Sequence, residues 1–387
     1  MHRFTEELRS FLRGELGQSG RVPLHEPLIN GNEWTFVKEC LDTGWLSSVG
    51  AFVDRFESDF ANYVGSASAV VTVNGTAALH MALYVSGVRP GDLVISPTLT
   101  FVATANAITH CGGEPIFIDS SPETLGMCPD ALRALLASCK VESRSLSYEG
   151  RRVAACVPVH IFGHDANIRE IAAICSEYGI PLIEDSTEAL GSSVDGRALG
   201  TFGRLGVFSF NGNKTITTGG GGMIVTNDVE LGARVKHLTT TARVRDRWNF
   251  VHDEVGWNYR MPNINAALGC AQLESLPKTL DWKRALTRAY QQRIGRKDGW
   301  HFFDRSPVNS SNYWLNAVIL DKPADRDIVL AECNEDGIEA RPCWVLMHKL
   351  APYSRSLRAS ALTGALDIES RLVNIPSSPH LGRLLVN

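Results

Sequence analysis

The 387-residue sequence lacks the patterns that would place it in a membrane or on nucleic acid. No stretch approaches the apolar length of a membrane-spanning helix, and residues 1–9 are rich in charge, so we expect a cytoplasmic protein. The 38 Lys and Arg nearly balance the 42 Asp and Glu, and no long run of like charge occurs. Neither a nucleic-acid partner nor an anionic membrane surface is therefore indicated.

Patterns for metal sites and disulfides are also missing. The nine cysteines are scattered without a C-x-x-C pair and with an odd total, which predicts reduced thiols and no zinc site. His160 and His164 have the spacing H-x-x-x-H, but a predicted strand end and a turn at Gly163 separate them. The glutamate of the zinc-protease motif is absent as well. We therefore predict no metal.

Two glycine-rich nucleotide fingerprints fail on position. Lys214-Thr215 resembles the end of a phosphate-binding loop, but Phe208 and Asn213 stand where that pattern needs glycine. No G-x-G-x-x-G follows a predicted strand and begins a helix. A nicotinamide-dependent dehydrogenase is therefore poorly supported.

What the sequence does contain is a regular alternation of strand and helix patterns from residue 69 to 240. An apolar run at 69–73 precedes a helical pattern at 77–88, and the run at 93–97 precedes another at 100–109. This α/β alternation predicts a largely parallel sheet with helices on both faces. Such sheets bind ligands beyond the carboxyl ends of their strands. The length and the 44% apolar content favour two domains, or one large domain with a smaller partner.

Residues suited to one cofactor recur at these strand ends. Asn74-Gly75-Thr76 begins a helix, where free amides suit a phosphate, and Phe101 could cover a planar ring. Asp185 and Lys214 follow two further strands. Each has an ordinary reading, as a capped helix, a core aromatic, a helix cap or a solvated lysine. Together they favour pyridoxal phosphate, whose ring nitrogen needs a carboxylate and whose aldehyde needs an amine.

The ordered motifs resemble the DegT/StrS family of pyridoxal-phosphate-dependent nucleotide-sugar aminotransferases from about Leu28 to Ser378. The stretches that carry the resemblance are Val73–Leu79, Ser96–Thr104, Pro158–Gly163, Ile183–Gly191, Phe208–Lys214 and Gly256–Met261. The subgroup associated with legionaminic acid synthesis is the most similar in three further stretches, Trp45–Gly50, Lys236–Thr241 and His252–Gly256.

The resemblance implies the aspartate-aminotransferase fold, known as pyridoxal phosphate fold type I. It implies a large domain at residues 1–255, with an N-terminal helical segment and a mainly parallel seven-stranded sheet, and a small α/β domain at residues 256–387. A helix is expected from Met261 to Leu276. The family also implies a homodimer with shared active sites.

Site roles carry over position by position. The resemblance makes Lys214 the Schiff-base lysine and proton shuttle, and Asp185 the partner of the pyridine nitrogen. The remaining cofactor-binding positions are Gly75, Thr76, Phe101, Glu188, Ser209, Asn211 and Asn258, the last reaching the phosphate of the neighbouring subunit. Candidate substrate-binding residues are Tyr259, Arg260, Arg341 and His348, for the last two of which a structural role fits equally well.

The function implied by the resemblance is amino transfer from glutamate to a UDP-linked 4-keto-6-deoxy-N-acetylhexosamine. Glu188 stands where many relatives carry Gln or His, while some sugar 4-aminotransferases carry Glu. The alternatives are transfer to a GDP- or dTDP-linked keto sugar at C3 or C4, a nicotinamide oxidoreductase, and a non-catalytic cofactor-binding regulator. The last would normally carry a DNA-binding extension, and none is evident.

Overall fold

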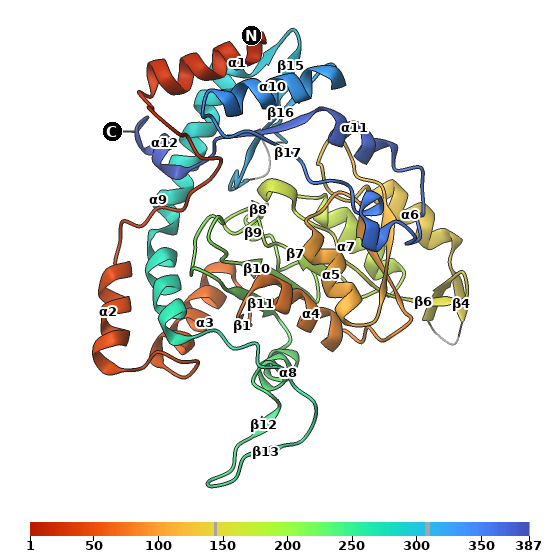
Figure 1. The fold of residues 1–387 in the computed structure, drawn as a ribbon. Coiled ribbons are helices and arrows are strands. Elements are labelled where there is room, and N and C mark those ends of the chain that lie inside the picture. Colours follow the sequence, from red (N-terminus) through yellow and green to blue (C-terminus); the bar gives the residue numbers. More distant parts are fainter. Residues whose placement is uncertain (143–144, 306–309, 387) are drawn as a thin grey trace.

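A twisted seven-stranded sheet forms the centre of the computed structural model, which describes residues 1–142, 145–305 and 310–386 (Figure 1). The sheet consists of two groups of hydrogen-bonded strands, which are joined through parallel bridges at Cys156–Leu182 and Val159–Asp185. The strands across the sheet are β1 (Ser68–Thr72), β11 (Gly222–Thr226), β10 (Leu205–Ser209), β7 (Ile183–Asp185), β6 (Arg151–Cys156), β2 (Leu93–Pro97) and β3 (Glu114–Ile118). β11 is antiparallel to both neighbours, whereas β10, β7, β6, β2 and β3 are parallel. The predicted sheet is confirmed.

Both faces of this sheet are covered because its strands are apolar on both sides. In β10, Phe208 belongs to one hydrophobic cluster with α3, while Val207 and Leu205 pack with α4 and α8 on the other face. The surrounding helices are α2 (Glu33–Thr43), α3 (Ala51–Val64), α4 (Gly75–Val85), α5 (Val102–His110), α6 (Pro129–Ser138), α7 (Ile168–Glu177) and α8 (Val229–Thr239). Short peripheral strands are β4 (Lys140–Glu142), β5 (Ser145–Tyr148), β8 (Ser193–Val194) and β9 (Arg197–Ala198).

A second sheet lies in the C-terminal part of the chain and is antiparallel throughout. Its strands, in order, are β14 (Arg296–Lys297), β15 (Trp300–Phe302), β16 (Asn316–Leu320), β18 (Leu372–Ile375) and β17 (Arg341–Pro342). The helices α10 (Pro323–Glu335) and α11 (Thr363–Arg371) accompany it. The N-terminal α1 (Arg3–Arg9) and the π-helical turn η1 (Ser10–Glu15) share a hydrophobic cluster with this sheet. Of the N-terminal segment that we assigned to the large domain, α1 and η1 therefore pack on the C-terminal sheet (Figure 1), whereas α2 packs on the first half of α9.

One long helix joins the two parts. α9 (Asn263–Ile294) begins near the expected residue but continues through Pro277, 18 residues beyond the predicted end at Leu276. Its first half packs on α2 and α3, and its second half on α12 (Pro379–Arg383) and the small sheet. The division at residues 255 and 256 stays a prediction. Among the described residues, no helix is long and apolar enough to cross a membrane.

A narrow hairpin extends away from the body (Figure 1). It consists of β12 (Arg243–Val244) and β13 (Val251–His252) and follows α8. Trp248 and Phe250 near its tip are 76% and 77% exposed. Exposed rings of this size are costly in water, so this hairpin, which we call the arm, is a candidate for contact with another protein surface.

Candidate active site

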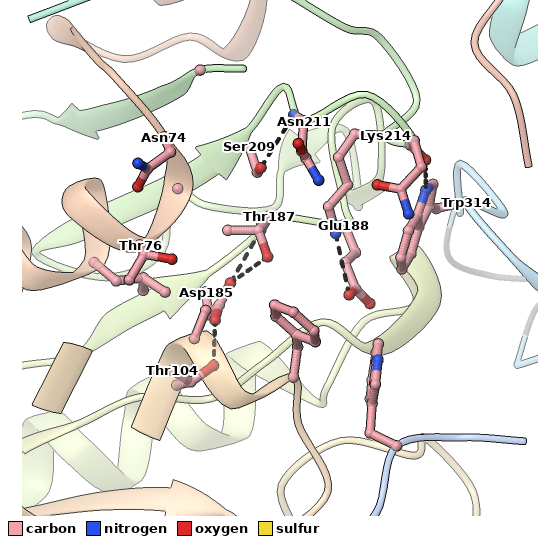
Figure 2. Close-up of a pocket in the computed structure, with 17 residues that line it drawn as sticks. Asn74, Thr76, Thr104, Asp185, Thr187, Glu188, Ser209, Asn211, Lys214 and Trp314 are labelled. Carbon is pink, nitrogen blue, oxygen red and sulfur yellow. Dashed lines mark hydrogen bonds and ion pairs between the residues drawn. The ribbon is translucent and has the colours of Figure 1, made fainter. Parts of the chain in front are cut away.

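A cavity of about 330 Å³ opens at the carboxyl ends of β1, β7 and β10. Figure 2 shows its lining residues converging from the large sheet and from the C-terminal part of the chain. The predicted residues that line it are Gly75, Thr76, Phe101, Asp185, Glu188, Ser209, Asn211 and Lys214. The strand-end argument had named Gly75, Thr76, Phe101, Asp185 and Lys214, and the resemblance had added Glu188, Ser209 and Asn211; all eight share one pocket.

The β1–α4 turn brings backbone amides to the pocket. Asn74 is the N-cap of α4, and its side chain accepts a hydrogen bond of 2.8 Å from the Ala77 amide. A Cβ at Gly75 would lie 3.0 Å from the Cβ of Ser209, so the turn approaches β10 as closely as glycine permits. The first amides of a helix have no partner within it and form the positive end of its dipole, and those of α4 begin at Gly75 in this turn. This corner suits an anion such as a phosphate.

Asp185 ends β7 with both carboxylate oxygens held. The Thr104 hydroxyl donates to Oδ2 at 2.7 Å, and the Thr187 hydroxyl donates to Oδ1 at 2.7 Å. The Thr187 amide adds a longer bond of 3.2 Å to Oδ1. The side chain is buried. These donors fix the orientation of the carboxylate.

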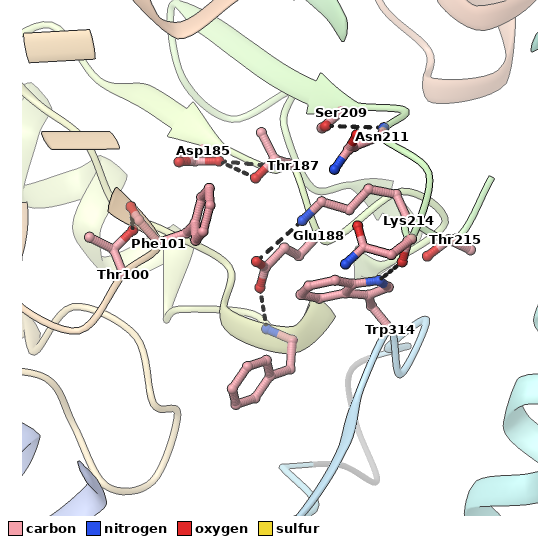
Figure 3. A network of polar contacts seen from close by, with 12 residues as sticks. Thr100, Phe101, Asp185, Thr187, Glu188, Ser209, Asn211, Lys214, Thr215 and Trp314 are labelled. Atoms are coloured by element: carbon pink, nitrogen blue, oxygen red, sulfur yellow. Dashed lines mark hydrogen bonds and ion pairs between the residues drawn. The ribbon is translucent and has the colours of Figure 1, made fainter. Parts of the chain in front are cut away.

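Lys214 lies on the loop after β10, and its amine points between an acid and an aromatic ring (Figure 3). Nζ is 3.4 Å from Glu188 Oε1 and 3.8 Å from the ring centroid of Trp314. Trp314 Nε1 donates to the Asn213 carbonyl at 2.7 Å, which fixes the ring beside the loop. An ion pair and a cation–π contact thus hold the amine inside the cavity.

Glu188 is buried on the other side of the amine. Its Oε2 accepts a hydrogen bond of 2.8 Å from the Phe162 amide. Phe162 has φ 55°, in the left-handed region that is costly for a bulky residue. Burial raises the pKa of Glu188 to about 7, although the Lys214 charge opposes the shift. The carboxyl group can therefore gain or lose a proton near neutral pH.

A family model for the DegT/DnrJ/EryC1/StrS aminotransferases matches residues 27–385. The chain belongs to this aminotransferase family. GDP-perosamine synthase of Vibrio cholerae is 35% identical over 365 residues, covering 93% of this chain and 95% of its own. A dTDP-4-dehydro-2,3,6-trideoxy-D-glucose 4-aminotransferase of Saccharopolyspora spinosa is 31% identical over 376 residues, covering 93% and 92%. The crystal structure of the aminotransferase TlmJ from Streptoalloteichus hindustanus superposes with a TM-score of 0.84, at 29% identity and with coverage of 95% and 97%.

Pyridoxal phosphate is the cofactor of this family, and the fold is that of the type I enzymes. The pocket fits this cofactor in three respects. The α4 N-terminus offers amides for a phosphate, Asp185 offers an oriented carboxylate, and Lys214 offers an amine in the same cavity. Phe101, whose side chain is 51% exposed, leaves its ring open to a flat ligand.

The other predicted residues lie outside this cavity. Arg260 Nε donates to Asn258 Oδ1 at 3.0 Å, and the Tyr259 hydroxyl contacts His80 Nδ1 at 3.0 Å. His348 is buried, with Nδ1 2.7 Å from the Thr98 hydroxyl, which fits the structural role. Arg341 borders a neighbouring cavity. Within one chain, these five residues therefore do not meet at the cofactor pocket.

Several lining residues escaped prediction. Thr104 and Thr187 stand in motifs that we singled out, and a donor search around Asp185 would have found them. Trp314 and Trp344 also line the pocket but come from the C-terminal part of the chain. Trp344 lies between the predicted residues Arg341 and His348. Trp314 follows the polar residues Ser310, Ser311 and Asn312, and no local pattern marks it.

Proposed function

We propose that this enzyme transfers the amino group of glutamate to a UDP-linked 4-keto-6-deoxy-N-acetylhexosamine. The product is a UDP-4-amino-4,6-dideoxy sugar for surface-glycan or legionaminic-type acid biosynthesis. The observation that carries amino transfer is the meeting of Lys214, Asp185 and the α4 N-terminus in one cavity. The similarity of the motifs to the legionaminic-type subgroup supports this acceptor.

The residues divide the work of holding the cofactor. Pyridoxal phosphate supplies, when bound, an electron-accepting ring that stabilises negative charge at a substrate carbon. Gly75, Thr76 and Ser209 would hold its phosphate, and Phe101 would cover its ring. Asp185, fixed by two threonines, would keep the ring nitrogen protonated. Each role uses a group that already lines the cavity.

Lys214 would bind the aldehyde and afterwards move the proton at the reacting substrate carbon. The contacts to Glu188 and the Trp314 ring keep Nζ inside the cavity. Because Glu188 has its pKa raised to about 7, it can share a proton with a neighbouring oxygen or amine at working pH. The same lysine serves both halves of the transfer, since both need a proton moved at one carbon.

A GDP-linked keto sugar is the second candidate acceptor. The GDP-perosamine synthase of Vibrio cholerae, at 35% identity over nearly the whole chain, favours it. The dTDP-sugar relative carries 4-aminotransferase in its name, which supports C4 as the reacting position for either acceptor.

The test is a transfer assay with purified enzyme, cofactor and glutamate. UDP-, GDP- and dTDP-linked 4-keto sugars are compared with a 3-keto sugar, and amino-sugar product is measured by mass spectrometry. We expect the UDP-linked 4-keto N-acetyl sugar to give the highest kcat/KM. Preference for a GDP-linked sugar would establish the second candidate, and no product from any keto sugar would refute the function.

We include a homodimer with shared active sites in this proposal. Asn258 follows the arm and lies outside the pocket of its own chain, and the arm carries exposed Trp248 and Phe250. A second copy would cover these rings. In a mixing test, Lys214→Ala and Asn258→Ala proteins are dissociated and reassembled together. Hybrid dimers with one intact site should regain part of the activity, and no recovery despite proven subunit exchange would contradict the shared site.

A further inference from the structure

Asn312 is a buried side chain on the segment before β16, and it does not line the cofactor pocket itself. Its Nδ2 donates hydrogen bonds to two backbone carbonyls of the loop after β7, at 2.8 Å to Glu188 and at 2.9 Å to Leu190. The same nitrogen lies 3.2 Å from the Thr215 hydroxyl, on the loop that carries Lys214. One amide group thus joins the loop of the buried acid to the loop of the catalytic amine.

The oxygen of the same amide holds the segment that carries the indole ring. Asn312 Oδ1 accepts a hydrogen bond of 2.8 Å from the Trp314 amide. Tyr313, between them, has φ 49°, in the left-handed region that is costly for a bulky residue. The Trp314 ring centroid lies 3.8 Å from Lys214 Nζ, and its Nε1 donates to the Asn213 carbonyl. The acid, the ring and the lysine loop are therefore all tied to one side chain.

The surroundings fix Asn312 in its place. Its backbone amide donates to Ser192 Oγ at 2.8 Å, and this hydroxyl donates to the Gly163 carbonyl at 2.7 Å. A Cβ at Gly163 would lie 1.8 Å from Asn312 Oδ1, so only glycine allows this close approach. The preceding Phe162 amide donates to Glu188 Oε2. Asn312 thus packs against the same turn that holds the Glu188 carboxylate.

A second buried asparagine of the same segment has contacts of a different kind. Asn316 Oδ1 accepts a hydrogen bond of 2.8 Å from the Thr287 hydroxyl, and its Nδ2 donates to Ser377 Oγ at 3.2 Å. Thr287 lies in α9 and Ser377 follows β18, so these bonds stay within the C-terminal part of the chain. Asn312 differs because its side chain reaches from the C-terminal part to two loops of the large sheet.

The geometry around the amine depends on this connection between loops. Lys214 Nζ and Glu188 Oε1 are 3.4 Å apart, although they belong to two different loops. Asn312 bonds to both loops, at the Glu188 carbonyl and at the Thr215 hydroxyl. A misplacement of about 1 Å between reacting groups can cost roughly a hundredfold in rate. A residue that sets the separation of the two loops can therefore control turnover without touching the substrate.

We propose that Asn312 is a positioning residue for amino transfer, which acts by fixing the Lys214 amine against the Glu188 carboxylate. This inference rests on the proposed role of Lys214 and adds to it a residue from the C-terminal part of the chain. Without the Asn312 side chain, two buried carbonyls and the Trp314 amide lose a partner. Because unpaired buried groups are costly, the loops then shift to find other partners, and the amine loses its fixed position.

The experiment compares two matched pairs of variants. Asn312→Ala and Thr215→Val remove the two sides of one asparagine–threonine contact. Asn316→Ala and Thr287→Val remove the corresponding contact within the C-terminal part and serve as controls.

Three quantities are measured for each protein. The half-reaction with glutamate is followed in pyridoxal phosphate holoenzyme by release of 2-oxoglutarate, which gives a limiting rate and a KM. In cofactor-free protein, acetylation of Lys214 by acetic anhydride is measured by peptide mass mapping, relative to the exposed lysines. Thermal unfolding is recorded in parallel.

We expect Asn312→Ala to lower the limiting rate by roughly ten- to a hundredfold, and Thr215→Val by less, with KM for glutamate little changed. Acetylation of Lys214 in Asn312→Ala should be faster by roughly two- to fivefold, the equivalent of one lost cation–π contact. The controls should keep the wild-type rate and labelling even where they unfold at a lower temperature. A purely structural role would lower the unfolding temperature of Asn312→Ala and leave its limiting rate and its labelling unchanged.

The possible failures are distinguishable. Equal losses of limiting rate in Asn312→Ala and Asn316→Ala, or a loss confined to KM, would overturn the positioning role. If Asn312→Ala does not fold, the comparison of Thr215→Val with Thr287→Val decides in the same way. If wild-type holoenzyme releases no 2-oxoglutarate, or if borohydride labels a lysine other than Lys214, the proposed function fails. Acetylation still tests the inference in that case, and equal Lys214 labelling in the variants and their controls would overturn it.

Discussion

The cofactor pocket and the cavity of about 590 Å³ that adjoins it differ in how far the protein satisfies its own polar groups. In the cofactor pocket, Asp185 receives hydrogen bonds from two threonines, and Glu188 is paired with Lys214 and the Phe162 amide. At the border of the adjoining cavity, His25 and Asn374 are buried, with polar atoms left unpaired. The polar groups of the cofactor pocket are thus paired within the chain, whereas these enclosed atoms of His25 and Asn374 have no partner among the described residues.

The contrast shows that the chain pairs its polar groups at the cofactor pocket. A resident cofactor benefits from groups already fixed in position, because reorganisation during each reaction would add to the barrier. Changes in the cofactor pocket should therefore affect chemistry and cofactor retention.

Replacement of the amine should give the largest effect. Lys214→Ala should lower kcat by roughly 10²- to 10⁴-fold or more, because it removes the group that moves the proton. Borohydride treatment followed by peptide mapping should label Lys214 in the wild type and no lysine in the variant. Label on a different lysine, or surviving turnover, would contradict the assignment.

Replacement of the Asp185 carboxylate should give the second largest effect on turnover. Asp185→Asn keeps the shape but cannot stabilise a protonated ring nitrogen, so we expect kcat to fall by roughly a hundredfold. KM for the acceptor should change little, since the shape of the side chain is kept. Measurement of both constants at saturating cofactor checks this. A hundredfold rise in KM with kcat unchanged would instead show that Asp185 acts in substrate binding.

A methyl group at the phosphate corner should have a moderate effect. Gly75→Ala would place a Cβ 3.0 Å from Ser209 Cβ and 3.2 Å from its Oγ, which crowds the α4 N-terminus. We expect cofactor affinity to fall roughly tenfold, in line with overpacking costs of about 1–3 kcal/mol. Gly212→Ala is the control, because nothing lies within 4 Å of its added Cβ. Equilibrium dialysis against pyridoxal phosphate measures the cofactor affinity of both variants. Equal affinities would show that this turn does not bind the phosphate.

The smallest effect should be a pH shift at Glu188. Its pKa rises from 4.5 to about 7 on burial, so its contribution to stability is present below pH 4.5 and is lost as pH rises through 7. In Glu188→Gln this loss should disappear. Urea unfolding of cofactor-free protein at pH 5 and pH 8 should show a smaller decline for the variant. The pH profiles of turnover and of cofactor absorbance should shift, with acceptor preference unchanged.

The cofactor pocket was largely predictable because its main groups follow strands of one parallel sheet. Asn74, Asp185 and Lys214 come from connections whose positions the apolar pattern marks, and parallel strands bring their carboxyl ends to one edge. The packing of α1 on the C-terminal sheet could not be read from the sequence in the same way. Its amphipathic pattern shows that one face is buried, but not which surface buries it.

The sequence by itself determined the family, the cofactor and the strand-end residues, because these depend on local patterns repeated in order along the chain. Only the tertiary structure placed Trp314 beside the Lys214 amine. It also brought His25 and Asn374, which are 349 positions apart in the sequence, to the border of one cavity. Those contacts form where the C-terminal sheet and the N-terminal segment pack beside the large sheet. Packing between distant segments depends on the shapes of whole surfaces, and no short stretch of residues encodes that information.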